Sequence, residues 1–272
     1  MKVNLYLEVI NRREDGFHNI FSVFYPVYSV YDNIYFYESK DFCFNCNLKE
    51  LENNDNLIVK AYNLLKEREV LNNVSIYLEK NTGYGAGLGS GSSNAAFTLK
   101  FLNSFWNLNL SREKILSLSE KIGSDVSFFI ENRPAIIEGK GSVTKILNYN
   151  KLYIIILKPK NVTINTGWAY KKVFENKLYS DNIATRDDFI KYYLNNNLEK
   201  MCENMFNTFE LLELDSLIKE GKEILYKSGA VRSMLSGSGS SVFGIYRNYN
   251  EYKNAINILK NKKIELYFDF YF

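Results

Sequence analysis

The segment KNTGYGAGLGSGSSNAA, residues 80–96, is the most informative stretch of this sequence, because glycine occupies every second position from Gly83 to Gly91. An alternating apolar segment over 74–78 precedes it and predicts a strand, and apolar residues at helical spacing follow it from Ala95. Glycines let backbone N–H groups approach an anion closely, and a helix N-terminus attracts negative charge. The strand, the glycine loop (residues 83–91) and the helix therefore predict a phosphate site.

The glycine loop does not match the two common nucleotide motifs. A Walker A loop needs Gly-Lys-Ser/Thr, and no lysine lies between Lys80 and Lys100. The dinucleotide motif fails because Ser90 and Ser92 stand where its third glycine would be. A flexible Gly/Ser linker is the alternative, but such linkers rarely lie tightly between a strand and an amphipathic helix.

Composition excludes several classes of protein. A chain of 272 residues forms one large domain or two modest lobes. The net charge of +3 comes from dispersed lysines, which argues against a nucleic-acid binder. No apolar run is long enough to span a bilayer, and the chain opens directly into an alternating strand pattern at Val3 without a signal peptide. We therefore expect a cytoplasmic protein.

Three cysteines and a single histidine offer few ligands for a transition metal. Cys43 and Cys46 have the C-x-x-C spacing, so a zinc or redox site has to be weighed, with Cys202 and His18 as further ligands. The residues around the pair predict a strand, which would place the two thiols on opposite faces. We expect no metal or redox centre there, and the odd cysteine count disfavours a disulfide framework.

The hydrophobic pattern predicts two lobes packed on each other, an N-terminal lobe over 1–149 and a C-terminal lobe over 150–272. Strands are predicted over 2–10, 20–30, 33–37, 43–46, 74–78, 135–138, 143–147, 151–159 and 264–270, with two short strands flanking a second Gly/Ser loop (residues 236–241). Helices are predicted over 56–67, 92–106, 111–122, 166–175, 186–195, 197–210, 211–227 and 249–262.

Three features together resemble one superfamily of enzymes. They are the glycine-rich stretch 83–94, the segment Gly123-Ser124-Asp125-Val126-Ser127-Phe128-Phe129, and the sequence Leu235-Ser236-Gly237-Ser238-Gly239. This combination resembles the GHMP superfamily of small-molecule kinases. The resemblance implies an α+β, two-lobed fold with an N-terminal ribosomal-protein-S5-like lobe, a C-terminal ferredoxin-like lobe and the active site in the cleft between them.

The N-terminal region resembles one family within this superfamily, the 4-diphosphocytidyl-2-C-methyl-D-erythritol kinases of the non-mevalonate isoprenoid pathway. The similar residues are the Lys2-x-Asn4 pattern and the turn from Asp15 to His18. Phe17 replaces the usual tyrosine of that turn, and Ser90 replaces a usual glycine of the loop. The resemblance implies phosphorylation of the 2-hydroxyl of CDP-methylerythritol by ATP, with Mg²⁺ held mainly by the ATP phosphates, no dedicated metal ligand, no nucleic-acid or membrane partner, and a monomer or homodimer.

The resemblance also assigns roles to individual residues. Asp125 would be the general base, and Lys2 would lie beside it and offset charge on the moving phosphoryl group. ATP would be bound by Asn56, Lys80, Gly85, Ala86, Gly87, Leu88, Gly89, Ser90, Gly91, Ser92, Ser93 and Asn94. The substrate would contact Asn4, Phe17, His18, Tyr170, Gly237 and Ser238.

Simpler interpretations of the same residues stay open. Asp125 could be a helix cap, Lys2 a terminal charge, Lys80 a solvated strand end and Tyr170 a packing residue. Two other functions also remain: another GHMP small-alcohol kinase of the homoserine or mevalonate type, and a non-catalytic nucleic-acid-binding protein on the same scaffold.

Overall fold

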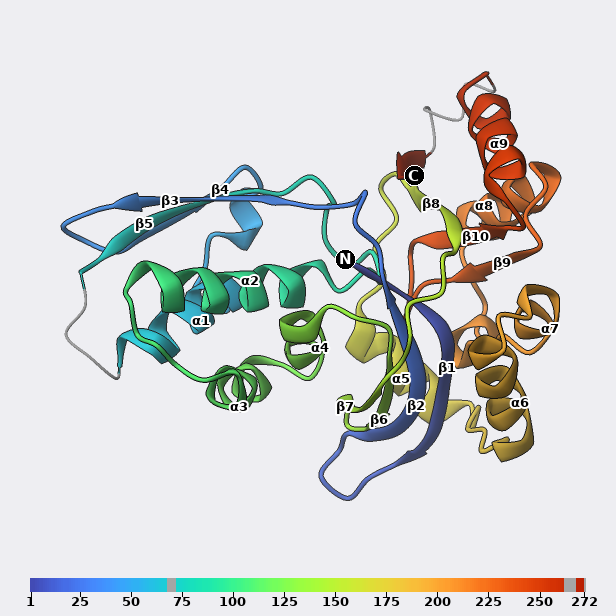
Figure 1. Ribbon diagram of the computed structural model, residues 1–272, viewed down its shortest axis with the longest axis horizontal. Coiled ribbons are helices and arrows are strands. Elements are labelled where there is room, and N and C mark those ends of the chain that lie inside the picture. Colours follow the sequence, from blue (N-terminus) through green and yellow to red (C-terminus); the bar gives the residue numbers. More distant parts are fainter. Residues whose placement is uncertain (68–71, 262–267, 272) are drawn as a thin grey trace.

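The computed structural model describes residues 1–67, 72–261 and 268–271 and has two lobes (Figure 1). The N-terminal lobe holds a sheet of order β1-β2-β6-β7 and a second sheet of order β3-β5-β4, with helices against them. Its strands are β1 (Lys2–Arg12), β2 (His18–Pro26), β3 (Asn33–Glu38), β4 (Cys43–Cys46), β5 (Val74–Glu79), β6 (Ala135–Gly139) and β7 (Ser142–Ile146). Its helices are α1 (Leu57–Lys66), α2 (Ser90–Phe105), α3 (Arg112–Ile122) and α4 (Val126–Glu131), with a short 3-10 turn at Lys49–Leu51.

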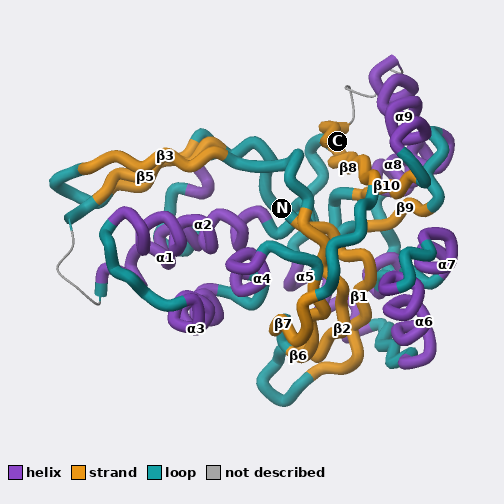
Figure 2. Tube along the Cα trace, in the orientation of Figure 1, coloured by secondary structure: helices purple, strands orange, loops and turns teal. Residues whose placement is uncertain are grey.

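The C-terminal lobe is built on one antiparallel sheet of order β11-β8-β10-β9, with helices around it (Figure 2). Its strands are β8 (Tyr153–Pro159), β9 (Arg232–Leu235), β10 (Val242–Tyr246) and β11 (Phe268–Tyr271). Its helices are α5 (Thr166–Glu175), α6 (Ile183–Leu194), α7 (Leu198–Glu203), α8 (Ser216–Lys227) and α9 (Tyr249–Asn261), with a 3-10 turn at Thr208–Leu211. The predicted α+β fold with two lobes is confirmed.

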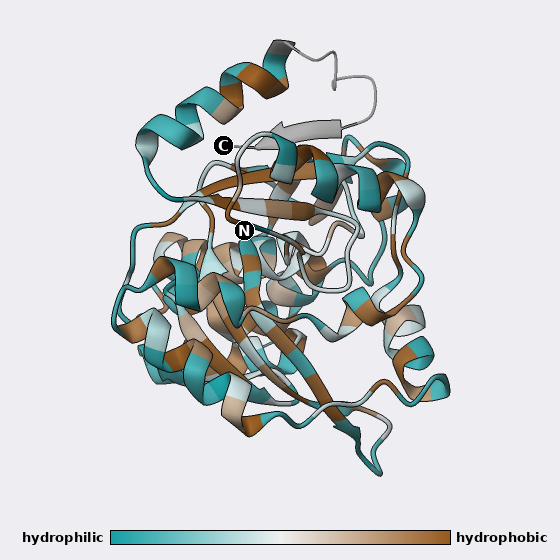
Figure 3. Ribbon diagram, turned by 90° about the vertical axis from the view of Figure 1, so that its right-hand side faces the viewer, coloured by the Kyte–Doolittle hydropathy of each residue, from teal (hydrophilic) through white to brown (hydrophobic). Residues whose placement is uncertain are grey.

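Strand β1 is buried on both faces, and this places its first residues inside the protein. Leu7 and Val9 belong to one cluster of buried apolar side chains, and Val3 and Leu5 belong to another. Figure 3 shows the same preference for apolar residues on the central strands and polar residues on the outer helices. Lys2 therefore starts the strand in surroundings that exclude most water, with only 4% of its surface exposed.

Polar contacts also tie β1 to the C-terminal lobe. The N–H of Leu7 donates to the carbonyl of Phe206 at 2.8 Å. The fully buried carboxylate of Glu8 pairs with Arg186 of α6 and accepts hydrogen bonds from Ser180 Oγ and from the N–H of Asn182. A buried charge is costly unless it is paired and hydrogen-bonded, so this network fixes α6 against β1.

Most predicted elements are confirmed to within a few residues, but the helix predicted over 197–210 is wrong. Helix α7 ends at Glu203, and the chain then runs alongside β1 in a parallel bridge between Leu7 and Asn207. The buried Asn207 side chain donates to the carbonyls of Leu235 and Gly237, each at 2.9 Å. These tertiary hydrogen bonds outweigh the local helical pattern.

Further differences from the sequence prediction concern single elements. The helix predicted over 211–227 begins only at Ser216, and α4 has no counterpart among the predicted helices. The strand predicted over 20–30 ends at Pro26, and the strand predicted over 264–270 is described only from Phe268, because its earlier residues lie outside the described ranges. The lobe boundary at 149/150 falls in the connection between β7 and β8 and stays a prediction.

We expect Asn207→Ala to lower the free energy of unfolding by about 2–3 kcal/mol, because it leaves the buried carbonyls of Leu235 and Gly237 without a donor. Urea unfolding monitored by circular dichroism measures this change. Asn254→Ala, on the exposed side of α9, is the matched control. A loss below about 0.5 kcal/mol would show that the stability of the fold does not depend on this amide.

Candidate active site

The glycine loop has a backbone conformation that depends on its glycines. Gly85, Gly87 and Gly89 have φ values of +63°, +73° and +66°, a region that L side chains rarely adopt. Gly89 is also the N-cap residue of α2, and no side chain caps the helix. The first N–H groups of α2 are therefore not used by a side-chain cap. Uncapped N–H groups at a helix N-terminus bind anions.

The glycine loop packs directly on the second Gly/Ser loop. The N–H of Ser240 donates to the carbonyl of Gly85 at 3.2 Å, and the hydroxyl of Ser236 donates to the carbonyl of Gly87 at 3.0 Å. A Cβ atom on Gly87 would lie 1.9 Å from the carbonyl oxygen of Ser236. No side chain fits there, so the two loops, one from each lobe, meet backbone to backbone.

A cleft of about 610 Å³ opens where these loops meet β1, the start of α1, the segment before α4, and α5. It is lined by every residue predicted for the site except Phe17, His18 and Ser93. Those lining it are Lys2, Asn4, Asn56, Lys80, Gly85, Ala86, Gly87, Leu88, Gly89, Ser90, Gly91, Ser92, Asn94, Asp125, Tyr170, Gly237 and Ser238. Residues far apart in the sequence thus share one cavity.

Lys2 is held at the centre of this cleft. Its ammonium group donates to Asn4 Oδ1 at 2.5 Å and to the carbonyl of Gly87 at 3.2 Å, and it lies 4.5 Å from the ring centroid of Phe24. Burial lowers the pKa of Lys2, while the charge of Asp125 opposes this shift. Lys2 is therefore buried and fixed by hydrogen bonds, and the interpretation as a loose terminal charge is wrong.

Asp125 presents a carboxylate that other side chains leave accessible. It occupies the N-cap position of α4, yet its side chain makes no capping hydrogen bond. Within residues 1–67, 72–261 and 268–271 no hydrogen bond or ion pair engages this carboxylate. Its charge nevertheless acts on Lys2 and on Tyr170. Asp125 is thus available to a ligand in the cleft.

Tyr170 lines the cleft and stacks with His18, which does not line it. Their rings stack with centroids 4.9 Å apart, and the rings of Tyr170 and Phe209 are nearly perpendicular, with centroids 5.0 Å apart. The ring of Tyr179 lies 6.2 Å from His18. The buried Nε2 of His18 and the buried hydroxyl of Tyr179 have no hydrogen-bond partner in the described part of the chain. Burial lowers the pKa of His18, and Arg12 adds to the shift, so the imidazole is neutral at pH 7.

Phe17 and Ser93 lie elsewhere. Phe17 is 61% exposed, with the ammonium of Lys140 at 5.2 Å from its ring centroid. Ser93 lines a separate cavity beside β3. Their predicted contacts with substrate and ATP stay predictions, and neither lines the main cleft.

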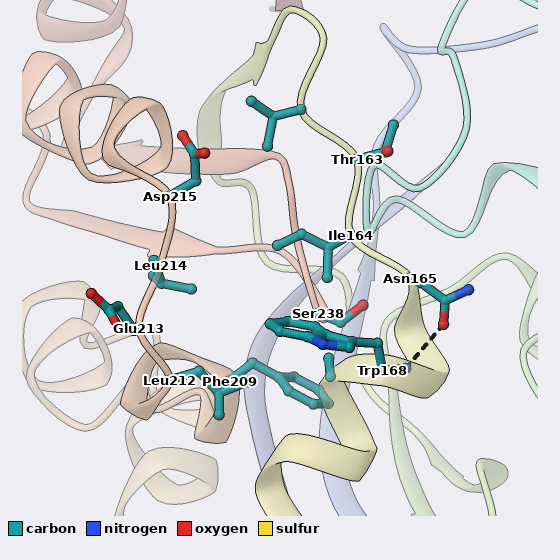
Figure 4. Close-up of a pocket in the computed structure, with 12 residues that line it drawn as sticks. Thr163, Ile164, Asn165, Trp168, Phe209, Leu212, Glu213, Leu214, Asp215 and Ser238 are labelled. Carbon is teal, nitrogen blue, oxygen red and sulfur yellow. Dashed lines mark hydrogen bonds between the residues drawn. The ribbon is translucent and has the colours of Figure 1, made fainter.

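A second cavity of about 340 Å³ adjoins the cleft (Figure 4). Trp168 and Phe209 line it, and Asn165 caps α5 by accepting a hydrogen bond from the N–H of Trp168. Ser238 lines both cavities and hydrogen-bonds to Thr166 at 3.1 Å. The α5 N-terminus therefore separates the two spaces.

Asp32 is the main site-associated residue that sequence reasoning missed. Its side chain is fully buried and pairs with Lys80 at 2.5 Å, although the two residues are 48 positions apart. Asp32 lies in the connection between β2 and β3, outside any motif, so no local signal marks it. Tyr179 and Phe209 were missed for the same reason.

The described residues hold few other functional features. No cluster of three or more His, Cys, Asp or Glu side chains that could hold a metal occurs among the residues described. Cys43 is exposed on β4 and Cys46 is buried, both as free thiols. In the same residues no helix has the length and apolar content to cross a membrane.

Comparison with known proteins identifies the family. The models of the GHMP kinase N-terminal and C-terminal domains match residues 56–133 and 189–265. The 4-diphosphocytidyl-2-C-methyl-D-erythritol kinase of Thermodesulfovibrio yellowstonii is 33% identical over 95% of this chain and 92% of its own. That of Bacteroides thetaiotaomicron is 37% identical over 90% and 89%. The chain belongs to this kinase family.

Solved structures agree with this assignment. A crystal structure of a 4-(cytidine 5'-diphospho)-2C-methyl-D-erythritol kinase superposes with a TM-score of 0.76 and 26% identity, covering 96% of this chain and 93% of that chain. The phosphomevalonate kinase of Streptococcus pneumoniae, at 13% identity and a TM-score of 0.72, shares the fold. The protein is therefore a small-molecule kinase of the GHMP type.

We expect activity to depend on the protonated form of Lys2. Because burial lowers the pKa of Lys2 below the ordinary value of 10.5, its charge is lost as pH rises through that lowered pKa, and turnover should fall there. The dependence of kcat on pH measures this decrease in turnover.

Lys2→Met should abolish most turnover at every pH, whereas Lys100→Met, on the exposed side of α2, should leave the profile unchanged. Full activity of Lys2→Met at neutral pH, or a wild-type profile that stays flat to about pH 10, would contradict a role for the Lys2 charge.

Proposed function

We propose that this protein transfers the γ-phosphoryl group of ATP to the 2-hydroxyl of 4-diphosphocytidyl-2-C-methyl-D-erythritol. One observation carries the proposal: Lys2 and Asp125 line the same cleft as the glycine loop. The relatives that bear this kinase's name are similar over nine-tenths of the chain or more.

The glycine loop and the start of α2 would hold the ATP phosphates. Phosphoryl transfer requires mainly that the reactants are positioned and that charge is stabilised. Backbone N–H groups and the helix dipole supply this without a Walker lysine. Mg²⁺ would be bound mainly by the phosphates, which suits a cleft whose described part offers no cluster of metal ligands.

Asp125 would act as the general base. It would take the proton of the 2-hydroxyl as that oxygen forms a bond to the γ-phosphorus and the bond to the ADP oxygen breaks. The charge of Lys2 would offset the negative charge that moves during transfer. The hydrogen bonds to Asn4 and to the Gly87 carbonyl hold that ammonium beside the glycine loop, where it would lie near the acceptor.

The aromatic group around Tyr170 would bind the cytidyl end of the substrate. A pyrimidine ring gains from stacking on an aromatic side chain and from hydrogen bonds at its edge. The free Nε2 of His18 and the free hydroxyl of Tyr179 could supply such bonds. Two buried polar atoms without partners beside an aromatic ring favour binding of a nucleobase over binding of a small alcohol such as homoserine.

A substrate panel tests the proposal directly. ADP release is measured with ATP and either CDP-methylerythritol, homoserine, mevalonate or no acceptor. We expect turnover with the cytidyl alcohol at least about a hundredfold above the other acceptors. Equal or faster turnover of homoserine or mevalonate, or tight RNA binding with no turnover, would favour the alternatives instead.

We expect Asp125→Asn to lower kcat by about 10²–10⁴-fold, because the amide cannot accept the hydroxyl proton. The affinity for ATP, measured by calorimetry, should stay within about twofold. Asp41→Asn, at an exposed position, is the charge-matched control. Wild-type turnover in Asp125→Asn would exclude Asp125 as the base.

A further inference from the structure

The entry and exit of the glycine loop are joined by a buried polar network. We call it the Asp32 network, and its members are Asp32, Lys80, Thr82, Ser90 and Asn94. Thr82 precedes the loop, Ser90 starts α2, and Asn94 lies one turn further along α2. The side chains of Asp32 and Lys80 are 0% and 3% exposed.

The carboxylate of Asp32 accepts five hydrogen bonds. Its Oδ1 accepts from the N–H groups of Asn81 and Thr82 and from the Thr82 hydroxyl, at 2.9–3.0 Å. Its Oδ2 accepts from Lys80 Nζ at 2.5 Å and from Asn94 Nδ2 at 2.9 Å. Burial opposes the charged carboxylate, but Lys80 and the hydrogen bonds from Asn94 and Thr82 outweigh it and lower the pKa of Asp32. Asp32 is therefore an ionised anchor for both ends of the loop.

The ammonium of Lys80 is fully used within the network. It donates to Asp32 at 2.5 Å, to Thr82 Oγ1 at 2.7 Å and to Ser90 Oγ at 2.7 Å. An ammonium group has three N–H donors, so no donor remains for a nucleotide while these bonds hold. Lys80 lines the cleft, but this geometry favours an indirect effect on ATP through the position of the loop.

We propose that Asp32 is a positioning residue for ATP, which it affects by fixing the glycine loop through Lys80 and Thr82. The inference rests on the proposed use of ATP. Backbone N–H groups bind phosphate well only when they are already oriented, because ordering a free glycine-rich loop costs conformational entropy at each binding event. The Asp32 network holds the loop at both ends before the nucleotide arrives.

Ser90 gives this chain one contact that a glycine at the same position would lack. Its hydroxyl accepts one of the three hydrogen bonds from Lys80. The departure from the usual glycine of the family thus adds a bond between the network and the first residue of α2.

The test compares two substitutions of Thr82, which is fully buried and does not line the main cleft. Thr82→Val keeps the shape but removes the hydroxyl that contacts Asp32 and Lys80, and Thr82→Ser keeps the hydroxyl. We expect Thr82→Val to raise the Kd and the KM for ATP by about five- to tenfold, with the KM for the alcohol within about twofold. Thr82→Ser should stay within about twofold of the wild type for both.

Asp32→Asn should have the larger effect, a rise of more than about tenfold in the Kd for ATP, since it removes the charge that compensates Lys80. Asp187→Asn, at an exposed position on α6, is the charge-matched control. Circular dichroism checks that each variant is folded, and the Thr82 pair decides the matter if Asp32→Asn is not.

Two results would overturn the proposal. One is an ATP affinity of Thr82→Val within about twofold of the wild type. The other is tighter ATP binding by folded Asp32→Asn, which would mean that a released Lys80 binds the nucleotide directly. ATP binding is titrated without any acceptor, so an error in the proposed alcohol substrate would appear in the substrate panel and leave this test intact.

Discussion

The contact between the glycine loop and the second Gly/Ser loop is the constraint on which the site depends. At Gly87 the two backbones approach so closely that a single Cβ would overlap the carbonyl of Ser236. The same carbonyl of Gly87 accepts from Ser236 and from Lys2, so one peptide group joins the second lobe, the glycine loop and the buried lysine. The cleft is lined by both loops at this junction.

Local sequence signals were sufficient for the parts of the site that lie in one motif. The glycine loop follows from alternation over 83–91 and from the strand and helix beside it, and most of the fold follows from the spacing of apolar residues. The prediction that Lys2, Asp125 and Gly237 share one cleft rested on the resemblance to the kinase family. No local pattern states that strand β1, the start of α4 and a C-terminal loop meet.

Asp32 and Asn207, which the sequence did not reveal, act through long-range hydrogen bonds, whereas the missed Tyr179 and Phe209 act through ring contacts. Asp32 belongs to no motif, and its hydrogen-bond partners Lys80 and Asn94 lie 48 and 62 positions away in the sequence. The helix predicted over 197–210 ends early because the Asn207 amide donates to two carbonyls about 30 positions away within the C-terminal lobe. A propensity pattern indicates the secondary structure that a segment favours in isolation. These side chains instead hydrogen-bond to backbone groups that need a partner in the folded chain.

The distribution of charge in the cleft suggests different roles for its lysines in ATP binding and in phosphoryl transfer. Among the described residues two lysines line it. Lys80 is paired with Asp32, whereas the ammonium of Lys2 is hydrogen-bonded only to neutral groups and interacts with the charge of Asp125. A lysine whose charge is compensated in the unliganded protein adds little to the affinity for ATP. The phosphates would therefore be bound mainly by backbone N–H groups. A cation at the point of transfer that has no hydrogen bond to a carboxylate would interact most strongly as charge shifts between the donor and the acceptor oxygen. That is the condition for lowering the barrier rather than only tightening ground-state binding.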